Sequence, residues 1–482
     1  MIERLVFENF LGGMCVSQYL AAKNQYYDGV NMDIITEPGR SAPGYAQTDK
    51  TGSELTTSPT KIVAPGISGE EEFVYGYSTT QMFRYDVFND AMTDNASWVQ
   101  TITNGDVGGF GVYKGKCYYA NGNTQIGSFT PGATPTFTAN TITGLTARTY
   151  SPMHVFGNIL WIGNLNQVAS YDGTTVNVNA LDLETGYEID HIDHFGKFLV
   201  ISAARTTGLS ANAAGVMQDA KLFFWDTTSD SWQEEIIVWG EQRIRGMKVV
   251  NNTLYVIGAN GLYVLDGAIL KKIVPFTGTN YSGNSYIGLS SSAVVESLEA
   301  WRDFLIWPGL SGTIMFYGTP DSKIPPFISA PVKLSTGNSV YVFGGLDQKL
   351  LVSGSSTIRF AKFASGGSGS YNLITSRVDF GGRVKIKGVR PKHKVFASGE
   401  SIDISVNYDT GNGENAIATS YNFATYGAVR ESFVPITQEP AVNNCYFKFA
   451  AGGGAKIDPG IEIFFERVET DGQSYSPIKE SQ

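Results

Sequence analysis

A short β-rich pattern recurs through the middle of this chain and restricts what the chain can fold into. Its clearest copy is Met247–Gly267, where three apolar runs are separated by two tight turns. Asn251 and Asn252 form the first turn, because asparagine tolerates left-handed backbone angles. The runs are filled by Val, Ile, Leu and Tyr, as expected for strands. One such meander cannot bury both of its faces, so it needs further copies of itself to pack against.

Turns of this kind recur at a fairly regular interval. The first turn of each candidate unit begins at Gly69, Gly115, Gly157, Gly196, Asn251, Arg302 and Asp347. Successive positions are 39 to 55 residues apart, and a period of about 40–50 residues with a few strands per unit is typical of β-propeller blades. Radial packing buries both faces of each small sheet and leaves only short edges. We therefore predict an all-β fold with a β-propeller of about seven blades, within a range of six to eight.

The composition agrees with an all-β chain. Aromatic residues make up 12 % of the 482 residues, charged residues only 17 %, and there are 55 glycines, a mixture that favours many short strands and tight turns. An array of β-sandwiches would show less regular spacing, and a β-helix would show a much shorter period. The longest interval contains an insertion, Ala203–Ala220, which we predict to be an exposed loop.

The repeats divide the chain into three parts. We predict an N-terminal docking arm over residues 1–50, a propeller over 51–370 and a C-terminal β-domain over 371–482. Pro38 and several glycines prevent the arm from forming one long element. Its apolar residues need a partner surface, either the first repeat or a neighbouring subunit. Ala364–Ser370 is typical of a flexible linker, and the roughly 110 residues after it suit a β-sandwich-like domain.

Charge and segment composition exclude some classes of protein. The formal net charge of −10 argues against a protein that coats nucleic acid, because such proteins are normally basic. No apolar run approaches the ~20 residues that a membrane-spanning helix needs, and the first residues lack the features of a signal peptide. Cys15, Cys117 and Cys445 are odd in number and far apart, so we expect reduced thiols in a chain made in a cytoplasm.

Few residues suggest catalysis or metal binding. His191 and Asp193 would share one face of a strand, and His194 would lie on the other face. A metal site needs three or four converging ligands, and this stretch alone does not provide them. Motifs for a serine nucleophile or a phosphate-binding loop are absent. A propeller glycosidase would need carboxylates that meet at the central pore, with Asp190, Asp193, Glu234 and Glu235 as candidates. We expect no catalytic residue, no metal, no cofactor and no enzymatic activity.

One basic stretch stands apart from the generally acidic chain. Arg383, Lys385 and Lys387 alternate with apolar residues and would share one face of a strand. That face could simply be solvated, or it could contact an acidic neighbouring subunit or passing DNA. Glu70–Glu72 is a candidate acidic partner.

Three parts of the sequence resemble the tail nozzle proteins of short-tailed bacteriophages, a family of packaged-DNA-stabilising virion β-propellers. The degenerate blades are one part. The others are a leading stretch and a terminal domain, with the motifs Phe7, Gly12-Gly13, Tyr19-Leu20, Gly29–Ile34, Pro38-Gly39, Thr375–Phe380 and Ile404–Gly411. The resemblance covers most of the chain through short motifs. It implies a homohexameric ring below the portal and adaptor rings that continues the DNA channel and helps to retain and eject the genome.

The resemblance also implies partners and a location. The partners would be further copies of the chain, portal or adaptor proteins, tail fibre or needle proteins, and double-stranded DNA that passes without sequence-specific binding. The protein would be made in the host bacterial cytoplasm and lie in the virion tail. Candidate interface residues are Phe7, Tyr19, Leu20, Asn31, Asp33, Arg383, Lys385 and Lys387. The alternative is a glycan-binding or glycan-cleaving propeller, such as a phage receptor-binding protein, which would need aromatic residues and carboxylates clustered at one pocket.

Overall fold

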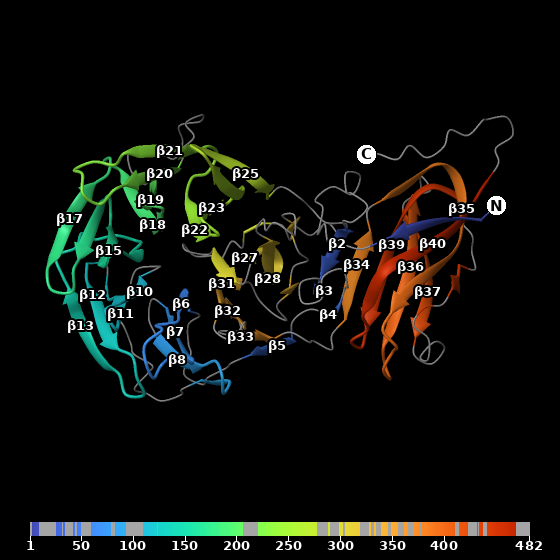
Figure 1. The fold of residues 1–482 in the computed structure, drawn as a ribbon, viewed down its shortest axis with the longest axis horizontal. Coiled ribbons are helices and arrows are strands. Elements are labelled where there is room, and N and C mark those ends of the chain that lie inside the picture. Colours follow the sequence, from blue (N-terminus) through green and yellow to red (C-terminus); the bar gives the residue numbers. More distant parts are fainter. Residues whose placement is uncertain are drawn as a thin grey trace.

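The fold is given by a computed structural model. It describes residues 2–8, 26–30, 32–33, 42–43, 46–49, 59–78, 82–92, 109–122, 124–205, 220–276, 288–289, 298–301, 304–318, 327–328, 332–333, 339–345, 349–354, 361–364, 370–375, 377–409, 414–422, 431, 433–436 and 441–468. These residues form strands and one short 3-10 helix, η1 (Leu310–Gly312). Figure 1 shows a ring of small sheets beside a separate group of long strands. The predicted all-β class is confirmed.

Seven small antiparallel sheets, counted over the described residues, make up the ring. The first blade consists of β6 (Lys61–Val63), β7 (Phe73–Tyr77), β8 (Met82–Asp86) and β9 (Ala91–Met92), and the second of β10 (Phe110–Tyr113), β11 (Lys116–Ala120), β12 (Ile126–Thr130) and β13 (Thr136–Ile142). The third blade consists of β14 (Met153–Phe156), β15 (Ile159–Asn164), β16 (Gln167–Tyr171) and β17 (Val176–Asp182). The fourth consists of β18 (Tyr187–Phe195), β19 (Phe198–Arg205), β20 (Ala220–Trp225) and β21 (Glu234–Val238). The fifth blade consists of β22 (Ile244–Val250), β23 (Thr253–Gly258), β24 (Gly261–Asp266) and β25 (Ile269–Pro275). The sixth consists of β26 (Glu299–Trp301), β27 (Phe304–Gly309), β28 (Thr313–Gly318), β29 (Phe327–Ile328) and β30 (Val332–Lys333). The seventh consists of β31 (Ser339–Gly344), β32 (Leu350–Gly354), β33 (Ala361–Ala364) and β5 (Ala46–Asp49).

The innermost strands of neighbouring blades contact one another around a closed circle. The contacts run from β6 through β10, β14, β18, β22 and β26 to β31, which contacts β6 again. This closure confirms a β-propeller of about seven blades. The predicted first turns are also in place, since Asn251 and Asn252 join β22 to β23 with φ angles of 49° and 57°.

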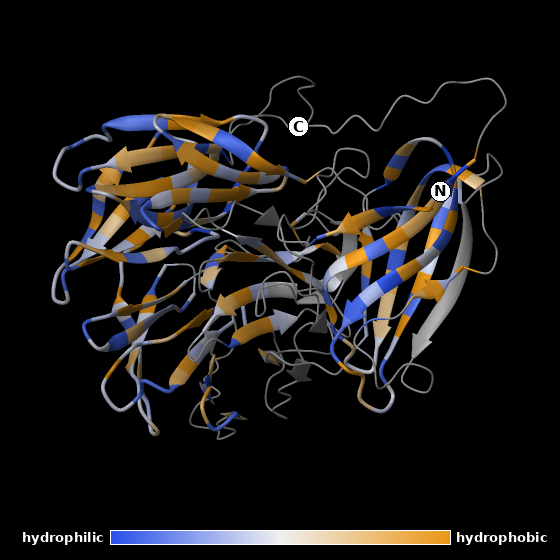
Figure 2. Cartoon of the chain, turned by 45° about the vertical axis from the view of Figure 1, so that its right-hand side comes forward, coloured by the Kyte–Doolittle hydropathy of each residue, from blue (hydrophilic) through white to orange (hydrophobic). Residues whose placement is uncertain are grey.

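Alternating side chains of one strand serve two neighbouring interfaces. Leu254 and Val256 of β23 pack with Val200 and Leu222 of the preceding blade. Tyr255 and Ile257 point to the other face and join a cluster with Leu305 and Trp307 of the next blade. Because fully burying an aliphatic or aromatic side chain contributes about 1.5–3 kcal/mol, these inter-blade layers hold the ring together. In Figure 2 much of the length of the blade strands is accordingly coloured hydrophobic.

The seventh blade is completed by the N-terminal part of the chain. β5 pairs antiparallel with β33, with Ala46 opposite Ala364 and Asp49 opposite Ala361. The last blade therefore joins strands from both ends of the propeller sequence. Opening the ring at this blade requires β5 to separate from β33.

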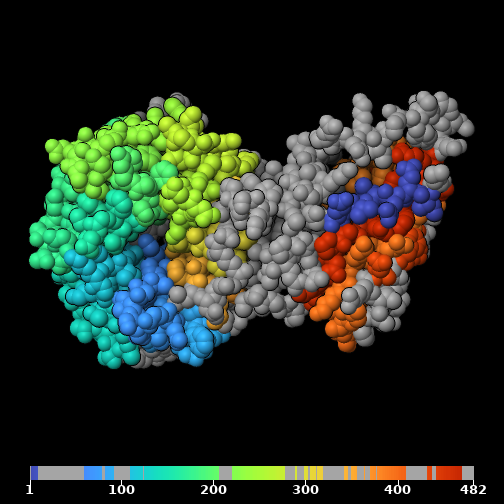
Figure 3. Space-filling model, in the orientation of Figure 1, coloured from blue at the N-terminus to red at the C-terminus, as the bar shows by residue number. Residues whose placement is uncertain are grey.

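Long strands form the C-terminal β-domain, and two N-terminal strands belong to it. Its members are β1 (Ile2–Phe7), β2 (Tyr26–Val30), β34 (Tyr371–Thr375), β35 (Val378–His393), β36 (Ser401–Asp409), β37 (Glu414–Asn422), β38 (Val434–Pro435), β39 (Ala441–Gly452) and β40 (Ile457–Arg467). β1 pairs with β40 along its whole length and β2 pairs with β34. Figure 3 shows β1 lying across the surface of this domain.

The described strands of the predicted docking arm, residues 1–50, pair within the same chain, and those that join its two domains do so at the C-terminal sheets and the seventh blade. Unpaired backbone groups need partners, and β1, β2 and β5 find them in the sheets of both domains. β3 (Met32–Asp33) and β4 (Ala42–Pro43) pair with each other. Phe7, expected at an interface, is 4 % exposed and packs edge-on against Phe447, with ring centroids 6.1 Å apart.

The insertion in the fourth blade differs from its prediction at both ends. Ala203 and Ala220, expected in an exposed loop, lie on β19 and β20 and are fully buried. Residues 206–219 between these strands lie outside the described part of the chain.

Among the described residues, no helix has the length and apolar character required to cross a membrane.

Candidate functional site

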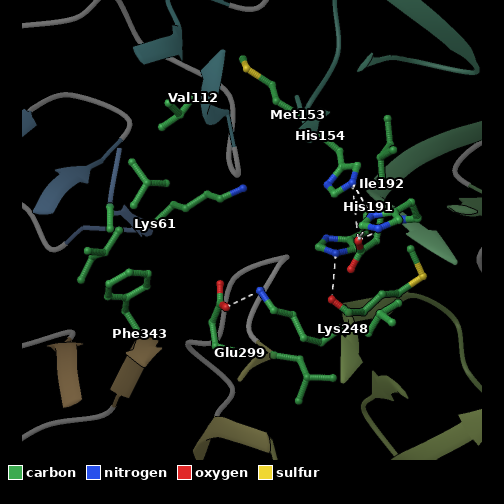
Figure 4. Close-up of a pocket in the computed structure, with 17 residues that line it drawn as sticks. Lys61, Val112, Met153, His154, His191, Ile192, Lys248, Glu299 and Phe343 are labelled. Carbon is green, nitrogen blue, oxygen red and sulfur yellow. Dashed lines mark hydrogen bonds and ion pairs between the residues drawn. The ribbon is translucent and has the colours of Figure 1, made fainter. Parts of the chain in front are cut away.

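A cavity of about 460 Å³ lies on the propeller axis. Every blade contributes to it through its innermost strand, with lining residues that include Lys61, Val112, His154, His191, Lys248, Glu299 and Phe343. Figure 4 shows these side chains around a common space, with the histidines gathered on one side. The closure of the ring thus brings together residues that are far apart in the sequence.

Three polar side chains of blades three and four meet at the cavity wall. His154 Nε2 lies 2.9 Å from His194 Nδ1, where one nitrogen donates and the other accepts according to the tautomer. Asp193 Oδ1 lies 3.7 Å from His154 Nε2 and 3.5 Å from His194 Nδ1. The two imidazole rings stack with centroids 5.1 Å apart. His154 comes from β14, whereas Asp193 and His194 come from the end of β18.

Burial and mutual charge set the ionisation of this group. Burial lowers the pKa of His154 to about 4, against the opposing effect of Asp193, and lowers the pKa of His191 to about 3. Burial by itself would raise the pKa of Asp193, but the hydrogen bond from His194 and the nearby positive groups bring it to about 2. The group therefore contains an anionic carboxylate beside a neutral His154 near pH 7.

The next two blades around the cavity hold an ion pair. Lys248 Nζ lies 2.6 Å from Glu299 Oε2, and Tyr341 donates a hydrogen bond to Glu299 Oε1 at 2.6 Å. His191, one of the two histidines singled out in the sequence, contacts the carbonyl oxygen of Met247 at 3.2 Å and is not part of the three-residue group.

The other end of β18 lies near a second, basic cavity of about 630 Å³. Arg205, Arg243 and Arg245 line it together with Tyr150. Arg243 lies 3.6 Å from Glu188 Oε2 and 3.7 Å from Asp190 Oδ2, and its guanidinium stacks over the Tyr150 ring at 4.2 Å. Sequence reasoning missed this cavity, although Arg243 and Arg245 alternate around Ile244, because Arg205 comes from the preceding blade and only the folded ring brings it to them.

The basic stretch of the C-terminal domain faces acidic residues of its own chain. Lys387 Nζ lies 3.0 Å from Glu466 Oε2, and Lys385 is opposite Glu466 in the β35–β40 pairing. An acidic partner is therefore supplied within the domain for Lys387. Glu70, proposed as such a partner from another subunit, instead forms an ion pair with Arg84 inside the first blade. Tyr19, Leu20 and Asn31 lie outside the described residues, and Asp33 is described only as part of β3.

The tryptophans considered for a glycan site do not line the two cavities described above. Trp161, Trp225, Trp301 and Trp307 are buried in blade interiors, and Trp232 packs against Phe223. Among the candidate carboxylates, Asp193 lies at the axial cavity and Asp190 contacts Arg243 near the basic one, while Glu235 pairs with Lys221 at 3.1 Å. No tryptophan lines either cavity.

Comparison with known proteins gives limited guidance. No protein-family model matches this chain, and no curated protein matches it. Similar solved structures include one titled "Structure of U3-55K", with a TM-score of 0.45 and 8 % identity over 66 % of this chain and 98 % of the other. Another is the extracellular domain of a putative one-component system from B. thetaiotaomicron, with a TM-score of 0.37 and 13 % identity over 74 % of this chain and 52 % of the other. The propeller assignment rests on the strand pairing described above.

Proposed function

We propose that this chain is a structural virion protein of a bacteriophage tail, a nozzle subunit that forms a ring below the head-to-tail connector. The observation that carries the proposal is the course of the N-terminal segment. β1 and β2 complete the C-terminal sheets, and β5 then completes the seventh blade. The chain passes between the two domains before and after the propeller, so two covalent connections join them.

This arrangement suits a part that must withstand load. If the two domains are pulled apart, both covalent connections still hold them together. Opening the propeller at its last blade requires the β5–β33 pairing to break. The buried cluster that contains Phe7 and Phe447 also includes Trp307 and Tyr317 of the sixth blade. A wall around pressurised DNA needs such connected domains, whereas a freely exchanging ligand-binding module does not.

The charge distribution supports a conduit rather than a DNA-binding protein. The chain has a formal net charge of −10, and phosphate groups are repelled by acidic surfaces. On the C-terminal domain, Arg4 and Arg390 both pair with Glu462, at 2.9 and 2.8 Å. Such pairing limits the positive surface that passing DNA would meet, and we expect the channel wall of the ring to be acidic or neutral.

Particles made without this protein distinguish a nozzle from a receptor-binding propeller. A nozzle subunit is needed to retain packaged DNA, so heads assembled in its absence should fill with DNA and then lose it to added nuclease. A receptor-binding protein is needed only for attachment. Particles that retain nuclease-resistant DNA and fail only to adsorb to cells would contradict the nozzle and support the glycan-binding alternative.

Charge neutralisation tests the contact surface separately. Arg383, Lys385 and Lys387 changed together to Gln should weaken incorporation of the protein into particles in a salt-sensitive way if the face meets acidic neighbours. The control is Lys271→Gln with Lys272→Gln on β25, which removes two positive charges from the outer strand of the fifth blade. Equal incorporation of both variants at all salt concentrations would exclude this face from the contact.

A further inference from the structure

The group formed by His154, Asp193 and His194 places three potential metal-ligating atoms around one point. They lie 2.9, 3.7 and 3.5 Å from one another. Two blades supply them, β14 of the third and β18 of the fourth. The expectation of no metal site relied on His194 and Asp193 pointing to opposite faces of their strand without three converging ligands, and the folded ring adds His154 to both of them.

The spacing fits a tetrahedral ion. Ligand atoms at the usual zinc–nitrogen and zinc–oxygen distances of about 2.0–2.2 Å lie about 3.3–3.6 Å apart in a tetrahedron. The three separations lie on both sides of that value. Two imidazoles and one carboxylate are also a donor set that zinc-type ions accept. We propose that His154, Asp193 and His194 bind one divalent transition-metal ion of the zinc class, which cross-links blades three and four at the propeller axis.

Neighbouring groups hold the ligands in orientation. The backbone N–H of His194 donates to Asp193 Oδ1 at 2.8 Å, and the Phe156 ring stacks on the His194 ring with centroids 5.3 Å apart. Such supporting contacts fix ligand geometry in metal sites. Binding needs the His154 and His194 nitrogens to separate by only about 0.4 Å to reach the tetrahedral spacing. All three side chains line the axial cavity, which has room for water or a small ligand as a fourth ligand.

Metal stoichiometry tests the site directly. The purified full-length protein is treated with a chelator, dialysed, loaded with Zn²⁺ and freed of excess ion, and zinc per chain is measured by mass spectrometry. We expect one equivalent in the wild-type protein and loss of that equivalent in His154→Gln and Asp193→Asn. The exposed Asp230→Asn on the same blade is the control and should retain the ion. Zinc should also raise the Tm of the wild-type and control proteins and leave the two ligand variants unchanged.

Cobalt provides a readout on the wild-type protein alone, so the test does not depend on variants that fold. Co²⁺ in a tetrahedral nitrogen–oxygen site absorbs visible light far more strongly than hydrated Co²⁺, and added Zn²⁺ should displace it. Absence of this absorption, absence of retained zinc, or equal zinc in the wild-type and ligand variants would each overturn the proposal.

Discussion

Glu70 and Arg84 form a two-bond ion pair inside the first blade. Arg84 Nε donates to Glu70 Oε2 at 2.9 Å and Arg84 Nη2 donates to Glu70 Oε1 at 2.8 Å. Tyr75 donates a further hydrogen bond to Glu70 at 2.6 Å, and the Arg84 guanidinium lies 3.3 Å from the Phe73 ring centroid. The pair aligns β7 and β8 with the turn before them and is shielded from solvent.

Removing the Glu70 charge should destabilise the propeller. Both side chains are about nine-tenths buried, and breaking a buried pair by removing one partner typically costs about 3–5 kcal/mol. We expect Glu70→Gln to lower the free energy of unfolding by an amount near the lower end of that range, since the amide still accepts hydrogen bonds. Glu72→Gln, at an exposed position in the same turn, is the matched control. Similar denaturation midpoints for the two variants would contradict this account of the pair.

A charge placed between blades should be poorly tolerated. Val256 is fully buried between the fourth and fifth blades, and burying an unpaired carboxylate costs several kcal/mol. We expect Val256→Asp, and likewise Tyr255→Asp, to lower the thermal stability of the propeller sharply. Ile269→Asp makes a comparable change on the outer strand of the same blade, where the side chain is 70 % exposed, and should have little effect. Unchanged stability of Val256→Asp would refute the inter-blade packing.

Phe7 should behave as a core residue of the C-terminal domain. Truncating a buried phenylalanine to alanine costs about 3–5 kcal/mol, and Phe7 lies in the same buried cluster as Phe447 and Ile461. We expect Phe7→Ala to weaken this domain, measured by amide hydrogen exchange on β40, while exchange in β11, whose buried residues belong to a separate cluster, stays unchanged. Ile2→Ala, at a position 63 % exposed on the same strand, is the control. Normal protection of β40 in Phe7→Ala would return residues 1–7 to the role of a loosely held arm.

The buried carboxyl group of Asp190 should contribute a decrease in the free energy of unfolding as the pH rises. Burial raises its pKa from 3.8 to about 6, although Arg243 and the hydrogen bond from Ser202 oppose the rise. Between about pH 4 and 6 the unfolded carboxyl is ionised while the folded one keeps its proton, so the folded state binds more protons and raising the pH removes stability. One such group contributes a slope of up to about 1.4 kcal/mol per pH unit. The free energy of unfolding, measured with urea at pH 4.5 and 6.5, should contain this contribution in the wild-type and Asp230→Asn proteins. The contribution should be absent in Asp190→Asn. The same pH dependence in all three proteins would contradict a role for Asp190.

The sequence was sufficient to predict the blades because their inner strands and first turns have strong local signals. Glycine and asparagine mark the turns, and the strand after each turn is apolar because both of its faces are buried. The outer strands were missed: β13 and β17 are largely exposed, so neither alternation nor apolar runs mark them. β5 was missed for another reason, since its partner β33 lies more than 300 residues later and pairing over that distance leaves no pattern in either strand alone.

The candidate site was predicted only in part, for the same physical reason. His191 and His194 were conspicuous as neighbours in sequence, yet the structure separates their roles and brings His154 to His194 instead. A single histidine in a four-residue strand carries no signal of its own. Its position becomes informative only when the ring closes and the inner strands of adjacent blades come into contact.

The symmetry of the native particle tests the central claim most directly. Cryo-electron microscopy of tails should show this propeller with its C-terminal β-domain repeated six times in a ring below the connector, around axial density for DNA. The wall facing that density should be acidic or neutral in the fitted structure. A particle in which the chain is absent from the axis, or occurs only in peripheral fibres, would contradict the proposal that it is a tail nozzle protein.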